Sequence, residues 1–135
     1  MRAVYGFCWL DVWNAGDTFF HIFPQILIYL ADNGVGYPGC GEFDTPEKWS
    51  DYLRKLGQDL KSLEADPYFE ENNQYSKDWE RIFENKVDEL EHPWLSNEEI
   101  NKLYFARDRE LAEERQAKLD EVGQRFFHII DSLWD

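Results

Sequence analysis

Hydrophobic residues recur at helical spacing in several segments of this chain, and the first such segment predicts a helix that reaches about residue 32. Asp17 can cap its N-terminus, because a carboxylate accepts hydrogen bonds from the first unpaired amides of a helix. Pro24 would either kink this helix or start a second helical piece. Asn33 and Gly34 predict its end, and a turn-rich loop follows. The expected apolar face consists of Phe19, Phe20, Phe23, Ile26, Leu27 and Leu30.

A second helix is predicted from a start signal at Thr45. Its hydroxyl can cap the helix, Pro46 suits the first helical position, and Glu47 places an acid in the first turn. Asp66 and Pro67 predict a break after this helix, and residues near 72–76 read as a loop. Its apolar positions continue at helical spacing as Trp49, Tyr52, Leu53, Leu56, Leu60 and Leu63.

A third helix is predicted from Lys77 to about Glu91, with His92 and Pro93 at its end. Four apolar residues share one face of this helix, and four acidic residues share another. The apolar face is Trp79, Phe83, Val87 and Leu90, and the acidic face is Glu80, Glu84, Asp88 and Glu91.

The last helix opens at Ser96 and Glu99, which have the form of a capping box, and it can reach Leu133. Its middle, residues 107–118, is rich in charge and poor in apolar residues. We expect that part either to extend into solvent or to pair with another copy of the chain. A stripe that faces the core resumes with Val122, Phe126, Ile129, Ile130 and Leu133.

The N-terminal segment is dense in aromatic residues, with Tyr5, Phe7, Trp9 and Trp13 inside residues 4–14. Its periodicity fits either a short strand or an irregular packed arm. The fold class predicted for the whole chain is a compact all-α domain of about four helices, with this aromatic arm and a long C-terminal helix. We expect residues 1–135 to form a single domain, from which an acidic segment over about 64–118 can protrude.

The charge of the chain narrows the functions it can have. The formal net charge is −14 and 17% of the residues are aromatic, so the acid decorates a chain that can fold. Residues 64–99 hold 12 acidic and 3 basic residues, whereas residues 1–41 hold 3 acidic and 1 basic. Because this acidic surface repels nucleic acid, we do not expect the chain to bind nucleic acid directly. We expect a basic protein partner instead.

The acidic face of the third helix is the first candidate site. Side chains at i and i+4 of a helix lie roughly 6 Å apart, close to the spacing of phosphates along a nucleic-acid strand. Such carboxylates can occupy a basic groove that normally holds DNA or RNA; the alternative is an ordinary solvated helix face. Trp94 either anchors a partner or caps the core. The candidate partner-binding residues are Glu70, Glu71, Glu80, Glu84, Asp88, Glu91, Trp94, Glu98 and Glu99.

No catalytic or metal-binding motif stands out. Cys8, Cys40, His21 and His128 offer zinc-type ligands, but no local spacing supports a site, and we interpret them as buried free cysteines and hydrogen-bonded core histidines. The chain contains no Gly-x-Ser-x-Gly elbow and no phosphate-binding loop. We expect a protein that is not an enzyme and needs no cofactor. Without a signal peptide or membrane segment, its expected location is the cytoplasm of a bacterial host.

Several short motifs occur in an order that resembles a family of small uncharacterised bacteriophage proteins. They are Tyr5-Gly6-Phe7, Asp11-Val12-Trp13-Asn14, Gly36-Tyr37-Pro38-Gly39, Thr45-Pro46-Glu47-Lys48-Trp49 and the ending Leu133-Trp134-Asp135. The resemblance covers about residues 4–63 and 119–135 and implies a phage or prophage origin. It carries over no catalytic residue, and the acidic segment falls outside it.

Together these observations lead to one functional hypothesis and one alternative. The hypothesis is a phage-encoded inhibitor that binds a basic, nucleic-acid-handling host defence protein, such as a CRISPR effector, by mimicking nucleic acid. The alternative is a structural or assembly protein of the phage that forms a homodimer or larger assembly through its long C-terminal helix. Neither hypothesis involves a membrane.

Overall fold

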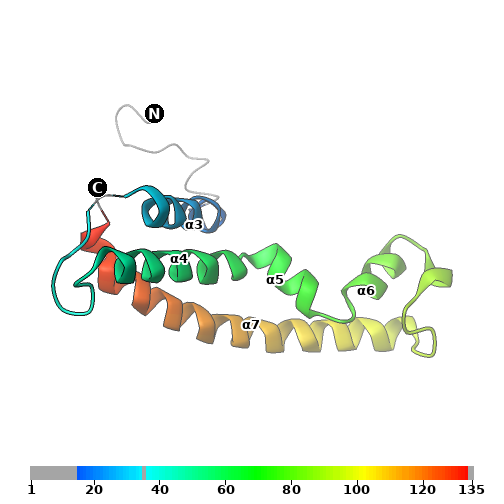
Figure 1. Ribbon diagram of the computed structural model, residues 1–135. Helices are drawn as coiled ribbons and strands as arrows, with labels where there is room; N and C mark the ends of the chain where they lie inside the picture. The colour runs from blue at the N-terminus through cyan, green and yellow to red at the C-terminus, as the bar shows by residue number, and fades with distance from the viewer. Residues whose placement is uncertain (1–14, 35, 134–135) are drawn as a thin grey trace, which may run out of the picture. The chain divides into compact units, whose positions relative to one another are not determined.

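The computed structural model describes residues 15–34 and 36–133, and within these residues the protein is all-α (Figure 1). This confirms the predicted fold class, including its long C-terminal helix. The aromatic arm over residues 4–14 lies outside the described residues. No strand occurs in the described ranges, where the elements are α3 (Ala15–Asn33), α4 (Pro46–Ser62), α5 (Ala65–Asn72), α6 (Ser76–Phe83), the 3₁₀ turn η1 (Val87–Glu89), α7 (Asn97–Ile129) and the 3₁₀ turn η2 (Ile130–Ser132).

The chain divides into two compact units. We call Ala65–Lys118 the central unit, and Met1–Glu64 together with Leu119–Asp135 the terminal unit. The helix α7 contributes its first part to the central unit and its last part to the terminal unit. The central unit has nearly the bounds of the acidic segment expected from the sequence, while the expectation of a single domain stays a prediction. Its 54 residues hold 15 acidic and 8 basic side chains.

The core of the terminal unit forms where α3 packs on α4. Gly57 makes this close approach possible, because a Cβ atom there would lie 2.9 Å from Ile28 Cγ1 and 3.0 Å from the Pro24 carbonyl oxygen. Phe19 and Phe23 of α3 meet Phe126 of α7 edge to face, at centroid distances of 5.6 Å. The buried side chains around these contacts are Leu27, Ala31, Phe43, Trp49, Leu53, Leu56, Leu60, Leu63, Val122, Phe126 and Ile129.

Polar contacts fix the last turns of α7 against α4. The Tyr52 hydroxyl donates to the Arg125 carbonyl oxygen at 2.8 Å, and the Arg125 guanidinium pairs with Asp59 at 2.7 Å. Burial alone raises the pKa of Asp59, but hydrogen bonds and charge from Lys55 and Arg125 outweigh it and hold the pKa below its ordinary value. The terminal unit thus combines an apolar core with a partly shielded ion pair.

Two helix starts follow the predicted capping chemistry. The Thr45 side chain accepts from the Lys48 amide at 3.3 Å, and α4 begins at Pro46 as expected. Ser96 and Glu99 form the predicted capping box, in which the Glu99 amide donates to Ser96 Oγ and the Ser96 amide to the Glu99 carboxylate. The stop at Asn33 is also confirmed, where the Gly34 amide bonds back to the Leu30 carbonyl oxygen.

Other local predictions are wrong. Asp17 lies inside the first turn of α3, so it does not cap that helix. Pro24 does not start a second helical piece, because α3 continues through it; a kink at Pro24 stays a prediction. A break does follow α4, which ends at Ser62, but Asp66 and Pro67 do not make it, because they lie in the first turn of α5, where a proline needs no amide partner. Ile26 and Ile130, both expected in the core, are 41% and 44% exposed.

The central unit has a small apolar core, in which Tyr68, Ile100 and Leu111 are the buried hydrophobic side chains. The charged stretch 107–118 packs against α5 on one side. Arg115 lies over the Phe69 ring at 5.9 Å and Lys118 over the Tyr68 ring at 5.3 Å. The expectation that this stretch extends into solvent or pairs with another copy is therefore wrong for that side of the helix.

None of the helices in the described ranges combines the length and the apolar character that a membrane crossing requires.

Candidate partner-binding surface

The helix α6 ends eight residues before the predicted end of the third helix. Asn85 adopts a left-handed φ of 60°, a conformation that asparagine tolerates better than most residues. The Asn85 amide donates to the Ile82 carbonyl oxygen at 3.1 Å and the Lys86 amide to that of Arg81 at 2.7 Å. This pair of hydrogen bonds is a Schellman motif, which turns the chain away from the helix axis.

The prediction that four acidic residues share one helix face is therefore wrong, because the helix does not continue through all four. Glu80 lies on α6 and Glu84 caps its C-terminus, whereas Asp88 belongs to η1 and Glu91 follows that turn. Like charges at i and i+4 oppose helix formation, and the asparagine supplies an alternative path for the chain. The regular spacing of about 6 Å does not extend beyond the first two of these carboxylates. The apolar face fails as well, since Phe83 is 80% exposed.

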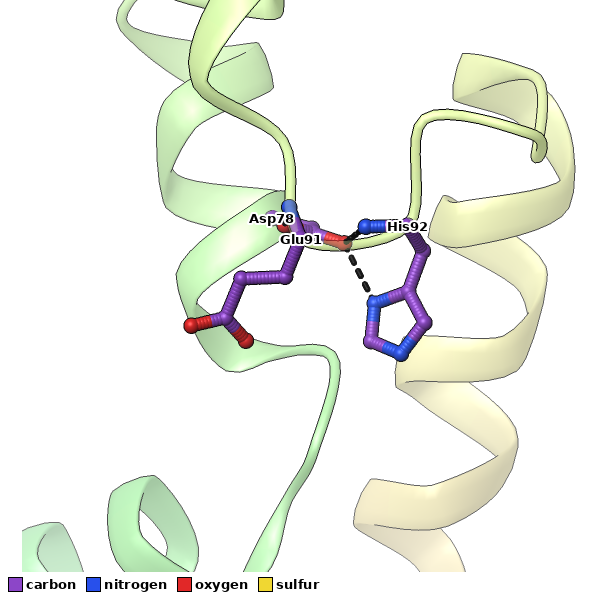
Figure 2. Close-up of side chains that lie close together, drawn as sticks. All are labelled: Asp78, Glu91 and His92. Carbon is purple, nitrogen blue, oxygen red and sulfur yellow. Dashed lines mark hydrogen bonds and ion pairs between the residues drawn. The ribbon is translucent and has the colours of Figure 1, made fainter.

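A buried carboxylate, Asp78, holds the returning segment against α6 (Figure 2). Its oxygens accept the Glu91 amide at 2.6 Å, the His92 amide at 3.0 Å and the His92 ring Nδ1 at 2.6 Å. Arg81, one turn later on α6, donates to the Glu89 carbonyl oxygen. These contacts fix the backbone of residues 89–92 and so position the loop that carries Trp94.

The ionisation of Asp78 reflects these contacts. Burial alone raises the pKa of its carboxyl, but hydrogen bonds from the Glu91 amide and from the His92 ring and amide outweigh burial and hold the pKa below its ordinary value. Asp78 is therefore an anion at neutral pH, and the His92 ring N–H donates to it.

Asp78, Glu91 and His92 are the one group of potential metal ligands among the described residues. Both oxygens of Asp78 already accept N–H hydrogen bonds, so an ion would have to displace them. Figure 2 shows the Glu91 and His92 side chains projecting from the segment that Asp78 holds, and one ligand atom from each of the three residues lies within 4.8 Å of the others. The cluster acts as a structural clamp, and the prediction that His92 ends a helix is wrong.

All nine predicted partner-binding residues belong to the central unit, and all nine are exposed. Glu84 pairs with Lys86 at 3.2 Å and Glu91 with Lys77 at 3.6 Å, while Glu99 serves the capping box. The remaining carboxylates make no ion pair with a described residue; they are Glu70, Glu71, Glu80, Asp88 and Glu98.

Two shallow grooves bring some of these residues together. We call the first the aromatic groove; it has a volume of about 420 Å³ and includes Glu70 of α5 and Glu80 of α6. The second combines Glu70, Glu71 and Glu91 with Lys77. Glu98 lies in a third groove beside Phe83. The complete lining of the aromatic groove is Asp66, Phe69, Glu70, Ser76, Trp79, Glu80 and Tyr104.

Stacked aromatic rings support this surface. Trp79 stacks on Tyr104 at 4.7 Å and on Phe83 at 6.0 Å, and its indole N–H donates to Asn101 at 3.0 Å. Figure 1 shows α6 lying along the first turns of α7, which these contacts connect. Trp94 is 73% exposed in the loop that Asp78 holds, so it does not cap the core. The surface therefore combines aromatic side chains held by stacking with carboxylates that have no ion-pair partner in the described ranges.

Sequence reasoning missed three residues that shape this surface: Asp78, Arg81 and Asn85. Asn85 was the detectable one, because asparagine is the commonest residue after glycine at a left-handed helix end. The role of Asp78 depends on a segment that returns from 13 residues away, and no local pattern reports such a contact.

Of the four residues with zinc-type side chains, Cys8 lies outside the described residues, and Cys40, His21 and His128 do not form a cluster within them. Cys40, His21 and His128 are all exposed, so the interpretation of these three as core residues is wrong. His128 is hydrogen bonded, but to the exposed Glu42.

Comparison of this chain with protein-family models, curated proteins and solved structures finds no match. The resemblance to small bacteriophage proteins stays a prediction from the sequence.

Proposed function

We propose that this chain is a phage-encoded acidic protein that binds and inhibits a basic, nucleic-acid-handling protein of its bacterial host. The observation that carries the proposal is a set of exposed carboxylates on the central unit that make no ion pair with any residue the structure describes: Glu70, Glu71, Glu80, Asp88 and Glu98. Unpaired surface carboxylates give a negative field that attracts a basic surface and repels nucleic acid. The site of action is the bacterial cytoplasm.

The mechanism follows from charge rather than from a regular phosphate-like spacing. A groove that binds nucleic acid is lined by lysine and arginine, and its partner loses counterions when it binds. The exposed carboxylates compete for those cations. Trp94 and Phe83, 73% and 80% exposed, supply the aromatic contacts that anchor most protein interfaces. A CRISPR effector is one target with the required chemistry.

Capture from a bacterial lysate with two charge variants tests the binding surface. Each variant lowers the number of carboxylates by four at positions without an ion pair to a described residue. The central variant carries Glu70→Gln, Glu80→Gln, Asp88→Asn and Glu98→Gln. The matched terminal variant carries Asp17→Asn, Glu47→Gln, Glu64→Gln and Asp131→Asn.

The unmodified chain is expected to retain a basic nucleic-acid-handling protein at low salt and to release it at high salt. The central variant loses this partner, whereas the terminal variant keeps it. Equal retention by both variants contradicts the proposed surface. Inhibition is tested separately by plating phage on bacteria that carry the captured defence protein, with and without expression of the chain.

Self-association is the second candidate function, favoured by exposed apolar side chains at the end of α7 and in η2. Phe127 of α7 is 69% exposed and Ile130 of η2 is 44% exposed. Burying such side chains between two copies would remove apolar surface from water. Light scattering over a range of concentrations tests this function; a monomer at every concentration contradicts it, and a dimer that Phe127→Gln dissociates supports it.

A further inference from the structure

We infer that the aromatic groove of the central unit receives an arginine side chain of the partner protein. This inference rests on the proposed function and assigns the chemistry and the place of its main contact. Asp66 and Glu70 come from α5, Glu80 from α6 and Tyr104 from α7, so three helices converge on one depression of about 420 Å³. A volume in this range suits a small ligand or a single large side chain.

The charge of the groove is of one sign. Its lining contains three carboxylates, of Asp66, Glu70 and Glu80, and no lysine or arginine. All three residues are exposed, and none makes an ion pair with a described residue. The three carboxylates of the groove are therefore available to a cation of a partner protein.

The walls of the groove are aromatic and held in place. Phe69, Trp79 and Tyr104 are half-buried. Trp79 is fixed by its stack on Tyr104 and by its hydrogen bond to Asn101. Burial, and after it the charge of Asp108, raises the pKa of Tyr104, so its hydroxyl stays neutral. Such walls cover the methylene stem of a long cationic side chain and shield its charge from water.

Arginine fits this groove better than lysine. A guanidinium has five N–H donors in a planar fork and can bond carboxylates of two different helices and the Ser76 hydroxyl together, whereas an ammonium is a compact point charge. The same region already holds a guanidinium against an aromatic ring, since Arg115 lies 5.9 Å from the centroid of Phe69. Arginine is also abundant in surfaces that bind nucleic acid, which is the class of partner proposed above.

Titration of the full chain with two synthetic peptides tests the inference. The probes are an N-acetylated peptide of six arginines and its six-lysine counterpart, which have equal charge. Binding is followed through the indole N–H signal of Trp79 in nitrogen–hydrogen correlation spectra, assigned with Trp79→Phe. We expect the arginine peptide to shift this signal and to bind at least about threefold more tightly than the lysine peptide.

A pair of matched variants locates the contact. Glu70→Gln with Glu80→Gln is expected to weaken binding of the arginine peptide about tenfold, because each change removes a partly shielded charge partner. Glu89→Gln with Glu113→Gln removes two exposed carboxylates of the same unit that lie outside the groove and outside the proposed partner-binding residues, and it is expected to change binding less than about twofold.

The outcomes separate this inference from the proposed function. Equal weakening by both pairs overturns the groove while leaving a diffuse acidic surface, and so does equal affinity for the two peptides. An unshifted Trp79 signal in a bound complex also overturns it. The proposed function is contradicted by a different result: the lysate capture experiment retains no basic partner.

Discussion

The two units of this protein are stabilised by different means. Of the 14 buried hydrophobic side chains among the described residues, 11 lie in the terminal unit and 3 in the central unit. Both buried polar side chains, Asn73 and Asp78, belong to the central unit. Because burial of apolar surface is the main stabilising contribution to folding, the terminal unit has the stronger core.

In the central unit, side-chain hydrogen bonds to the backbone take over part of this role. Asn73 donates to the Tyr104 carbonyl oxygen at 3.1 Å and accepts from the Tyr75 amide at 3.0 Å, next to the clamp made by Asp78. Large apolar residues remain at the surface, among them Phe83, Trp94 and Phe105. The unit with the smaller core is therefore also the unit that presents the candidate binding surface.

The largest expected effect comes from the terminal core. Leu53→Ala removes a fully buried side chain and is expected to lower the free energy of unfolding by about 2–5 kcal/mol, through lost transfer free energy and a residual cavity. The control, Phe83→Ala in the central unit, removes a larger side chain that is 80% exposed and should change it by less than about 0.5 kcal/mol. Urea unfolding followed by circular dichroism compares them; similar losses would remove the contrast between the units.

The next largest effect concerns the clamp of the central unit. Asp78→Ala leaves the Glu91 and His92 amides without their acceptor and is expected to cost about 2–4 kcal/mol, confined to the central unit. Hydrogen exchange measured by mass spectrometry should speed up over residues 76–95 and stay unchanged over α4. Asp88→Asn, an exposed change of one charge in the same unit, is the control and should leave exchange unaltered. Faster exchange in α4 would mean that the two units unfold together.

Two glycines sharpen the account of the terminal unit. Gly57→Ala is expected to destabilise it by about 1–3 kcal/mol, because the new methyl group meets Ile28 and the Pro24 carbonyl oxygen at 3.0 Å or less. Gly123→Ala, where nothing lies within 4 Å of the added Cβ, is expected to stabilise the protein by about 0.5–1 kcal/mol, since alanine favours the helix. Thermal unfolding of both variants shows whether each substitution raises or lowers the stability. A stabilising Gly57→Ala would contradict the close packing of α3 on α4.

The smallest effect expected is the loss of folding stability at acid pH that each unit's aspartate causes. Each unit has one partly or fully buried aspartate with a lowered pKa, Asp59 in the terminal unit and Asp78 in the central unit. A carboxyl whose folded pKa is below its unfolded value of about 3.9 stabilises the protein above that value, and the contribution disappears as the pH falls through the folded pKa. Stability should therefore decline below about pH 4.

Asn substitutions assign this decline to the two units. In urea unfolding between pH 7 and pH 2.5, Asp59→Asn and Asp78→Asn should each start less stable at pH 7 and lose less on acidification than the unmodified chain. Exchange over α4 reports the first change, and exchange over residues 76–95 the second. An acid response that neither substitution reduces would show that other carboxyls control it.

The sequence predicted the elements whose signals are local. Thr45 with Pro46 starts α4, and Ser96 with Glu99 starts α7, because capping depends on residues only three positions apart. Pro67 was misread because the same residue suits a helix start and a helix break. The end of α6 was missed because the apolar spacing continued through Asn85 while the chain turned.

Only part of the candidate site could be predicted from the sequence. Exposure of the nine partner-binding residues was implied by their charge, whereas their grouping depends on tertiary contacts. Glu70 and Glu80 share a groove because α5 and α6 pack on α7, and Trp94 is positioned by Asp78 through hydrogen bonds to residues 91 and 92. Contacts of this kind leave no periodic trace in the chain.

Hydrogen exchange of the full chain, alone and bound to the basic protein that it captures, locates the binding surface. We expect slower exchange in the bound state over residues 66–84 and around Trp94, and no change over α3 and α4 of the terminal unit. Protection confined to α3, or to the end of α7 around Phe127, would contradict the claim that the central unit is the binding surface.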